Sequence, residues 1–134
     1  VLFRSLPVNP NYAQGINVAD QEADPHSMLN FYRRLLALRK CTPALITGSY
    51  EPVNEEAQDY LAFLRRADDR RADGQTCLVV LNMSAQPQTA RFALPHHATC
   101  LFSSHGREGE IIPLSALHLQ PFEIFIGEMT GSPA

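Results

Sequence analysis

Residues 76–83 read Thr76-Cys77-Leu78-Val79-Val80-Leu81-Asn82-Met83 and contain an unbroken apolar run from Cys77 to Leu81. A short apolar run without alternation is typical of a central strand that is covered on both faces. On either side of it, apolar residues recur with period two and turn residues separate further short segments. The predicted strands are Gly48–Val53, Asp59–Arg66, Thr76–Met83, Thr89–Leu94, Thr99–Ser104, Leu114–Leu119 and Phe122–Gly127. This spacing predicts a mainly β fold, an antiparallel β-sandwich.

One helix is predicted before the strands. Asp24 is the expected N-cap, Pro25 the first helical residue and Cys41 the end, because Pro43 follows it closely. Apolar residues cover about half of the helix circumference at 100° per residue. They are Met28, Leu29, Phe31, Tyr32, Leu35, Leu36 and Leu38. Such a wide apolar arc indicates a helix between two neighbours. Arg39 lies within the arc, so its head either has a carboxylate or carbonyl partner or reaches solvent along its apolar stem.

Residues 6–24 show no sustained periodicity and are predicted to be a loop. Loops of this length are usually functional or part of something larger. The first five residues, Val1-Leu2-Phe3-Arg4-Ser5, are the translation of GTG CTC TTC CGA TCT, the end of a common sequencing adapter. We therefore expect residues 1–5 to be an adapter scar and exclude them from the fold, the alternative being a native apolar segment. A scar would place the true N-terminus upstream of Leu6.

Composition narrows the class of protein. The 134 residues are 45% hydrophobic and 19% charged with a net charge of -3, which is typical of a globular domain. A nucleic-acid partner would need a basic surface, and a bilayer span would need about 20 consecutive apolar residues. We expect neither partner. Cys41, Cys77 and Cys100 form no CxxC pair, so we expect buried thiols in a reducing compartment and neither a metal site nor a disulfide framework.

No residue pattern predicts catalysis. His96 and His97 follow Pro95 in a turn, where adjacent side chains diverge, and neither has an acid or a cysteine at ligand spacing. His26 is predicted in the first helical turn, His105 in a Gly-rich loop and His118 in a strand, so solvated or hydrogen-bonded histidines are expected and no metal site. The acid pairs Glu55-Glu56 and Asp68-Asp69 lie in polar stretches, where solvated loop charges are expected. Asn82-Met83-Ser84 matches the glycosylation sequon, with little weight in the absence of a visible secretory signal. From the sequence we assign no catalytic, substrate-binding or metal-binding residue and no cofactor.

Residues 6–50 carry a specific resemblance. The segment comprises Leu6-Pro7-Val8-Asn9-Pro10-Asn11-Tyr12, Ile16-Asn17-Val18, Gln21, the run from Asp24 to Leu35, Leu38-Arg39-Lys40, Pro43-Ala44-Leu45-Ile46 and Gly48-Ser49-Tyr50. It resembles the C-terminal part of the α-amylase superfamily, glycoside hydrolase family 13, in the α-glucosidase and oligo-1,6-glucosidase group. Beyond residue 50 the resemblance is looser, although Val80-Leu81-Asn82-Met83-Ser84 and Leu119-Gln120-Pro121-Phe122-Glu123 fit the same terminal domain.

The resemblance implies a domain organisation. Residues 6–41 would be the tail of a (β/α)8 catalytic barrel, comprising the loop after its eighth strand and its eighth helix, and residues 45–134 the C-terminal sandwich. The family hydrolyses α-1,4- or α-1,6-glucosidic bonds with retention, using carboxylates on the fourth, fifth and seventh barrel strands, which precede this segment. Asp20, Glu22 and Asp24 therefore inherit no catalytic role. The Asn9–Tyr12 loop either shapes the rim of the substrate pocket or is purely structural.

The leading hypothesis is a cytoplasmic bacterial glycosidase whose C-terminal part is this chain. The chain alone would be inactive and structural, its partner would be the barrel of the same protein, and the barrel would bind the α-glucoside. In the isolated chain the arc of Met28, Phe31, Leu35 and Leu38 would be exposed. The chain would then be marginally stable or prone to associate. One alternative is a free-standing carbohydrate-binding β-sandwich, against which the absence of Trp counts. Another is an interaction domain that caps a separate barrel.

Overall fold

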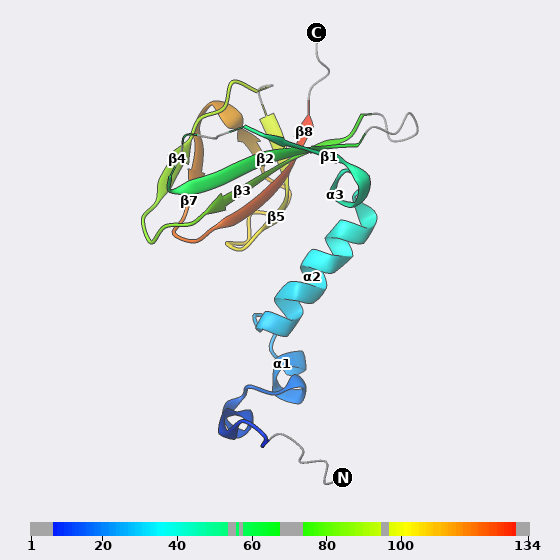
Figure 1. Ribbon diagram of the computed structural model, residues 1–134, viewed down its shortest axis with the longest axis vertical. Helices are drawn as coiled ribbons and strands as arrows, with labels where there is room; N and C mark the ends of the chain where they lie inside the picture. Colours follow the sequence, from blue (N-terminus) through cyan, green and yellow to red (C-terminus); the bar gives the residue numbers. More distant parts are fainter. Residues whose placement is uncertain (1–6, 54–55, 57, 68–73, 95–96, 131–134) are drawn as a thin grey trace, which may run out of the picture. The chain divides into compact units, whose positions relative to one another are not determined.

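The computed structural model describes residues 7–53, 56, 58–67, 74–94 and 97–130, so the expected adapter scar lies outside the described residues. The chain divides into two compact units, residues 1–37 and residues 38–134. The first contains the 3-10 helix η1 (Pro10–Gln14), α1 (Val18–Ala23) and most of α2 (Met28–Cys41). The second begins with the last turn of α2 and α3 (Pro43–Thr47), as labelled in Figure 1.

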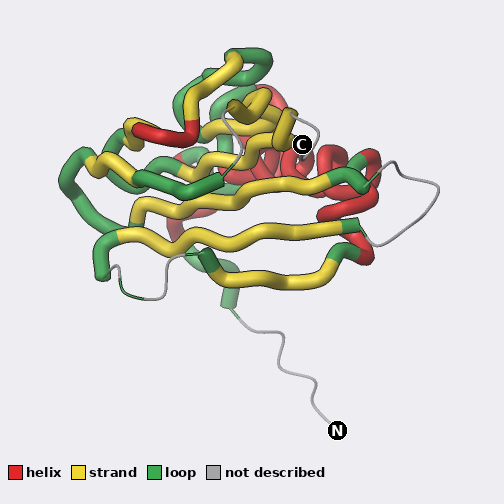
Figure 2. The backbone as a smooth tube through the Cα atoms, turned by 90° about the horizontal axis from the view of Figure 1, so that it is seen from above, coloured by secondary structure: helices red, strands yellow, loops and turns green. Residues whose placement is uncertain are grey.

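The second unit is built around an antiparallel sheet of six strands in the order β1-β2-β3-β8-β5-β6. Their bounds are β1 (Ser49–Pro52), β2 (Tyr60–Arg66), β3 (Thr76–Asn82), β5 (His97–Ser103), β6 (Ile111–Pro113) and β8 (Ile124–Thr130). Two shorter strands, β4 (Gln88–Ala90) and β7 (Leu117–Leu119), form a second sheet next to the 3-10 helix η2 (Leu114–Ala116). Figure 2 shows the long strands lying side by side. The predicted mainly β, antiparallel fold preceded by a helix is confirmed.

The core lies between the two sheets. Alternate residues of β2 and β3, namely Ala62, Leu64, Leu78 and Val80, are fully buried there with Phe125 of β8. Leu117 and Leu119 of β7 close the other side. The intervening residues of β3 are apolar as well, and Cys77 and Val79 are also buried. The unbroken run therefore belongs to a strand that is apolar on both faces, as its sequence predicts.

The first unit differs from the prediction in two respects. Residues 6–24, predicted to be a loop, contain η1 and α1. Helix α2 begins at Met28 and not at Pro25, and Asp24 is the C-cap of α1. The side chain of Ser27 takes the capping role, accepting a hydrogen bond from the Asn30 backbone N–H at 3.2 Å. The short capped helices escape prediction because one or two turns show no periodicity.

The strands also deviate from their predicted bounds. Pro43 is predicted only to end the helix before it, but it is also the first residue of α3. The predicted strand Thr89–Leu94 is paired only over Gln88–Ala90, and Leu114–Ala116 is a 3-10 turn that precedes β7. Strand β6 is absent from the prediction, since its three residues Ile111–Pro113 end in a proline. The deviations concern the shortest elements, which contain too few residues to show a periodic pattern in the sequence.

Candidate functional site

The segment before α2 is held by a polar cluster, which we call the α1–α2 clamp and which consists of Gln21, Ser27 and Asn30. The Asn30 side-chain amide donates to the backbone carbonyls of Gln21 at 2.9 Å and of Asp24 at 2.8 Å. The Ser27 hydroxyl donates to the Gln21 carbonyl at 2.6 Å, and the Gln21 side-chain carbonyl accepts from the Leu29 N–H at 3.1 Å. The end of α1 is thereby fixed to the start of α2, because its last carbonyls receive side-chain donors.

Two further asparagines, Asn9 and Asn17, hold the Asn9–Tyr12 loop, for which the resemblance leaves open a role at a pocket rim or a purely structural one. Asn9 caps η1 by accepting from the Asn11 N–H at 3.3 Å. Asn17 caps α1 by accepting from the Asp20 N–H at 2.9 Å, and its amide donates to the Tyr12 carbonyl at 2.7 Å. The Asn9–Tyr12 loop is therefore an ordered 3-10 turn with an exposed Tyr12 ring. Its hydrogen bonds support a structural role, and its place at a pocket rim stays a prediction.

The three acids near this segment take part in local structure. Asp20 receives the Asn17 amide at 2.6 Å, and Asp24 receives the His26 N–H at 2.9 Å. Glu22 forms an ion pair with Arg33 at 2.6 Å, in which both side chains are about half exposed. No two of these carboxylates face each other across a dry cleft in the contacts of the described residues. Each of the three carboxylates has a local partner in its own segment.

The second unit contains a buried carboxylate, Glu123, in the turn before β8. It is fully buried and accepts from the Gln120 N–H at 2.7 Å and the Ser103 hydroxyl at 2.8 Å. The Arg107 guanidinium lies 3.3 Å away and also donates to the His118 carbonyl at 2.8 Å. Every oxygen of this carboxylate thus has a donor, which is the arrangement that makes a buried charge tolerable. The network ties the β5–β6 and β7–β8 connections together.

The remaining sequence candidates are dispersed. His26, His97, His105 and His118 are all exposed, whereas His96 lies outside the described residues, as do Glu55, Asp68 and Asp69. Among the described residues no three His, Cys, Asp or Glu side chains converge as metal ligands would. Asn82 of the sequon is buried, and its amide donates to the carbonyls of Gln86 and Gln120, both at 2.8 Å. In the folded chain this amide is not accessible for glycosylation.

The prediction of three buried cysteines is wrong for one of them. Cys77 and Cys100 are buried, but Cys41 at the end of α2 is exposed. Burial raises the pKa of Cys77 to about 12, with the Glu128 carboxylate adding to the shift. Burial likewise raises the pKa of Cys100 to about 11, again with an acidic neighbour, Glu108. Both thiols are therefore inert hydrophobic residues at neutral pH.

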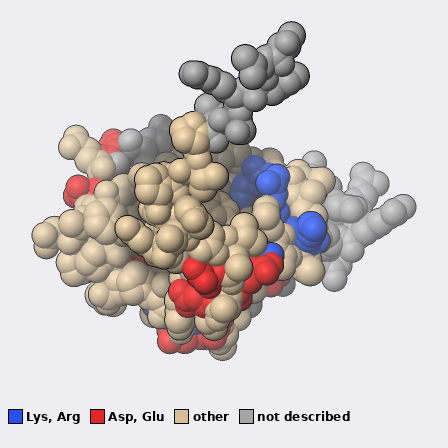
Figure 3. Space-filling model, turned by 90° about the horizontal axis from the view of Figure 1, so that it is seen from below, with Lys and Arg blue, Asp and Glu red and all other residues tan. Residues whose placement is uncertain are grey.

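Arg39 is exposed, so its guanidinium reaches solvent and needs no buried partner. The face drawn in Figure 3 is largely uncharged, with a few basic and acidic side chains on it. No helix among the described residues is long and apolar enough to cross a membrane.

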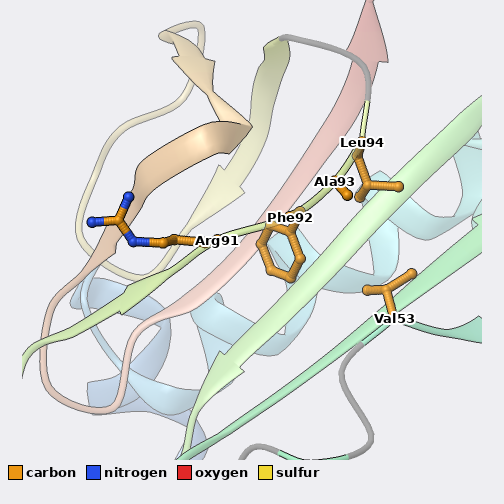
Figure 4. A pocket seen from close by; sticks show the side chains of 5 residues that line it. All are labelled: Val53, Arg91, Phe92, Ala93 and Leu94. Carbon is orange, nitrogen blue, oxygen red and sulfur yellow. The ribbon is translucent and has the colours of Figure 1, made fainter.

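A small cavity of about 210 Å³ lies at one end of the sandwich. Its lining comprises Val53, Arg91, Phe92, Ala93 and Leu94. Figure 4 shows the Arg91 guanidinium directed away from the Phe92 ring, so the lining combines one arginine with apolar side chains. Specific ligand sites combine an apolar wall with a few convergent polar groups, whereas Arg91 is the one polar side chain among the described lining residues of this cavity. It is an open end of the core.

The α1–α2 clamp is not recognisable as a unit from the sequence. Gln21 and Asn30 are both part of the family resemblance, but their spacing of nine residues matches no general motif. The sequence shows only that Asn30 is a polar residue in the predicted helix and that Gln21 lies in the predicted loop before it. It takes the fold to show that both residues join the end of α1 to the start of α2.

Comparison with known proteins finds relatives along most of the chain, although no family model matches it. The chain is 32% identical over 130 residues to the oligo-1,6-glucosidase of Halalkalibacterium halodurans, covering 92% of this chain and 22% of that protein. It is 33% identical over 120 residues to the glucan 1,6-alpha-glucosidase of Streptococcus dysgalactiae subsp. equisimilis, covering 90% of this chain and 20% of the relative. The chain thus spans about a fifth of the length of these relatives.

Solved structures agree with the sequence relatives. The trehalulose synthase MutB from Pseudomonas mesoacidophila MX-45 matches with a TM-score of 0.78 and 36% identity, over 92% of this chain and 21% of that structure. Its F164L mutant, from crystals soaked with trehalulose, matches equally well with 37% identity. At this identity the likeness extends beyond the shape of the fold.

Proposed function

The chain belongs to the α-amylase superfamily, glycoside hydrolase family 13, as the C-terminal part of a member of its α-glucosidase and oligo-1,6-glucosidase group, and we propose that it stabilises the catalytic domain of such an enzyme. The enzyme would hydrolyse α-1,4- or α-1,6-glucosidic bonds with retention of configuration. Residues 6–41 would complete the (β/α)8 barrel, and residues 45–134 would form the sandwich that follows it. The chain alone would be catalytically inactive.

The exposed apolar side chains of the first unit are the observation that carries this proposal. Met28, Tyr32 and Leu36 are 64%, 56% and 53% exposed and lie four residues apart. Residues with this spacing form one ridge along a helix, which is the surface that packs into the groove of a neighbouring helix. The sequence predicts exposure of Phe31, Leu35 and Leu38 as well, but these three side chains are half-buried. The exposed part of the apolar arc is therefore the ridge that begins at Met28.

The interior of the first unit supports the same role. Among its described residues only Ser27 is buried, and the contacts that hold the unit together are the polar ones of the α1–α2 clamp. Val8, Ile16 and Val18 are each more than half exposed. A segment with ordered hydrogen bonds and no apolar core of its own gains its stability from a larger structure. A barrel that supplies neighbouring helices would meet this need.

The role in catalysis is therefore indirect. Asp20, Glu22 and Asp24 are occupied by caps and an ion pair, which supports catalytic carboxylates elsewhere in the protein. A cytoplasmic location is part of the proposal and is supported by the three free cysteines, since reduced thiols are typical of that compartment.

The proposal is tested by expressing the longest protein that carries this chain and, separately, the 134 residues alone. We expect the longer protein to hydrolyse isomaltose or maltose and to release the α-anomer first, as a retaining enzyme does. The 134 residues alone should release no glucose at the same molar concentration. Hydrolysis by the short chain would contradict the proposal, as would a longer protein that binds these sugars and leaves them intact.

A further inference from the structure

The turn between β7 and β8 carries an exposed aromatic ring on a strained backbone. Phe122 has a φ of +54° and is the one non-glycine residue with a positive φ in the described part of the chain. A bulky side chain rarely adopts this conformation, because it is unfavourable for any residue with a Cβ. The ring is nevertheless 62% exposed, so packing within the chain offsets little of the strain.

Hydrogen bonds on both sides of Phe122 impose this conformation. The Phe122 N–H donates to the Ser84 carbonyl at 3.1 Å, and the Glu123 N–H donates to the Gln120 carbonyl at 3.1 Å. The buried Glu123 carboxylate accepts from the Gln120 N–H at 2.7 Å. Strained residues persist where the surrounding structure fixes them in this way, and they are concentrated at sites that bind ligands. The strain at Phe122 therefore indicates a use for the exposed ring.

Two glutamines are held next to this turn by one buried group. The Asn82 side-chain amide donates to the backbone carbonyls of Gln86 and Gln120, both at 2.8 Å, and so brings together residues that are distant in sequence. Both glutamines are exposed, and among the described residues neither side-chain amide has a hydrogen-bond partner. Each amide therefore keeps its donors and its acceptor for a ligand. We call Phe122, Gln86 and Gln120 the Phe122 platform.

We propose that the Phe122 platform binds a chain of α-linked glucose units, and this inference rests on the proposed function. The exposed ring offers a flat apolar surface on which the apolar face of a pyranose can lie. The two glutamine amides are the polar groups that would bind its hydroxyls, as a specific site requires beside an apolar wall.

The charges behind the platform favour a neutral ligand. The Glu123 carboxylate is fully buried and paired with the Arg107 guanidinium at 3.3 Å. Arg107 is also paired with Glu110 at 3.2 Å and donates to the His118 carbonyl at 2.8 Å. These groups satisfy one another, so an ionic ligand would find no unpaired partner in this network. A neutral sugar loses little by comparison, because amides and hydroxyls are sufficient to bind it.

The first test is a titration of the 134-residue chain with maltoheptaose, followed by the NMR signals of its backbone amides. We expect saturable shifts at Ser84, Gln86, Gln120 and Phe122. Phe122→Ala should weaken binding by at least about tenfold, because the stacking surface is lost. Ile111→Ala is the matched control, since Ile111 is a 69% exposed apolar residue on β6, and it should leave binding unchanged. No shifts up to the solubility limit of the sugar, or equal binding by both variants, would overturn the proposal.

A second variant shows whether the ring has a structural role instead. Phe122→Gly removes the ring and the strain together, because glycine adopts a positive φ without cost. We expect its midpoint of urea denaturation to equal or exceed that of the unchanged chain. A clearly lower midpoint would show that the ring supports the fold, and that result would overturn the argument from strain.

The longer protein that carries this chain separates the platform from the proposed function. In a native gel that contains soluble starch, Phe122→Ala should reduce the retardation of the longer protein, whereas Ile111→Ala should not. Both variants should hydrolyse maltose or isomaltose at the unchanged rate. Equal retardation of the two variants would overturn the platform, including the case in which another domain covers it, and would leave the proposed function intact. A longer protein that hydrolyses neither sugar would overturn the proposed function instead.

Discussion

At the scale of single residues, Gly48 is required for space. Its backbone angles suit any residue, with φ -59° and ψ 147°. A Cβ there would, however, collide with the Ala44 carbonyl oxygen and lie 3.0 Å from the Arg66 backbone. The Gly48 N–H donates to the Ala44 carbonyl at 3.1 Å and closes the last turn of α3, next to the backbone of Arg66 on β2. Neither backbone has a flexible end that could move aside.

We therefore expect Gly48→Ala to lower the free energy of unfolding by about 3 kcal/mol, the upper range for overpacking. Gly106→Ala is the control. Gly106 has a φ of +72° and open space around it, so the cost should be about 1 kcal/mol from backbone strain alone. Urea denaturation followed by circular dichroism measures both. A larger loss for Gly106→Ala would contradict this explanation.

The buried Glu123 permits a second prediction at this scale. Glu123→Ala removes the acceptor of Ser103, Gln120 and Arg107 at once. The partly buried guanidinium of Arg107 then keeps only the more exposed Glu110 carboxylate and the His118 carbonyl. We expect a loss of about 3 kcal/mol, compared with less than about 1 kcal/mol for Glu22→Ala, which breaks a half-exposed ion pair. The comparison is made by urea denaturation of the two variants, and equal losses would show that Glu123 is not structural.

The two buried thiols predict how stability depends on pH. The pKa values of Cys77 and Cys100 in the folded chain are about 12 and about 11, against 9.0 ordinarily. Above pH 9 the unfolded chain loses these protons first, so ionisation favours unfolding as the pH rises toward 12. The fall in stability between pH 8.5 and 10.5 should be shallower in a Cys77→Ala, Cys100→Ala double variant. Parallel falls in the two proteins would contradict burial of the thiols.

At the scale of elements, the α1–α2 clamp predicts that Asn30 orders α1. Asn30→Ala removes the donors to the Gln21 and Asp24 carbonyls, so the end of α1 should open more often. Amide hydrogen exchange in residues 18–23 should then accelerate by about tenfold, equivalent to about 1.4 kcal/mol of local stability. Arg33→Ala breaks only the exposed pair with Glu22 and should leave exchange nearly unchanged. Unchanged exchange in Asn30→Ala would refute the clamp.

The longer elements could be predicted from the sequence, whereas the shorter ones could not. The long strands β2, β3 and β8 are predictable because seven residues are enough to display periodicity and an apolar face. Strand β6 and helix α1 escape prediction because they are too short to show periodicity and because their stability comes from pairing with β5 and from the Asn30 donors, contacts that a sequence pattern does not reveal. The predicted helix start is misplaced by three residues since Asp24-Pro25 is a strong capping signal, yet Ser27 supplies the cap. At the candidate site the sequence shows the residues but not their contacts.

At the scale of the whole molecule, the exposed ridge of Met28, Tyr32 and Leu36 predicts the behaviour of the isolated chain. Exposed apolar surface of this kind binds hydrophobic dyes and promotes association. We expect the 134 residues to bind such a dye in the folded state, and Tyr32→Glu to reduce the fluorescence at least about twofold. Ile111→Glu, on the sandwich edge, is the control for loss of a single exposed side chain. A monomer that binds no dye would contradict the prediction.

The proposal that matters most at this scale is that the chain is the C-terminal, non-catalytic part of an α-glucosidase-type enzyme. The most direct measurement is to sequence the genomic DNA upstream of the codon for Leu6 and follow its reading frame. We predict an open frame of roughly 470 codons, since the chain spans about a fifth of its relatives, encoding a (β/α)8 barrel with the family's catalytic carboxylates. A start codon within a few residues of Leu6, with no barrel before it, would contradict the proposal.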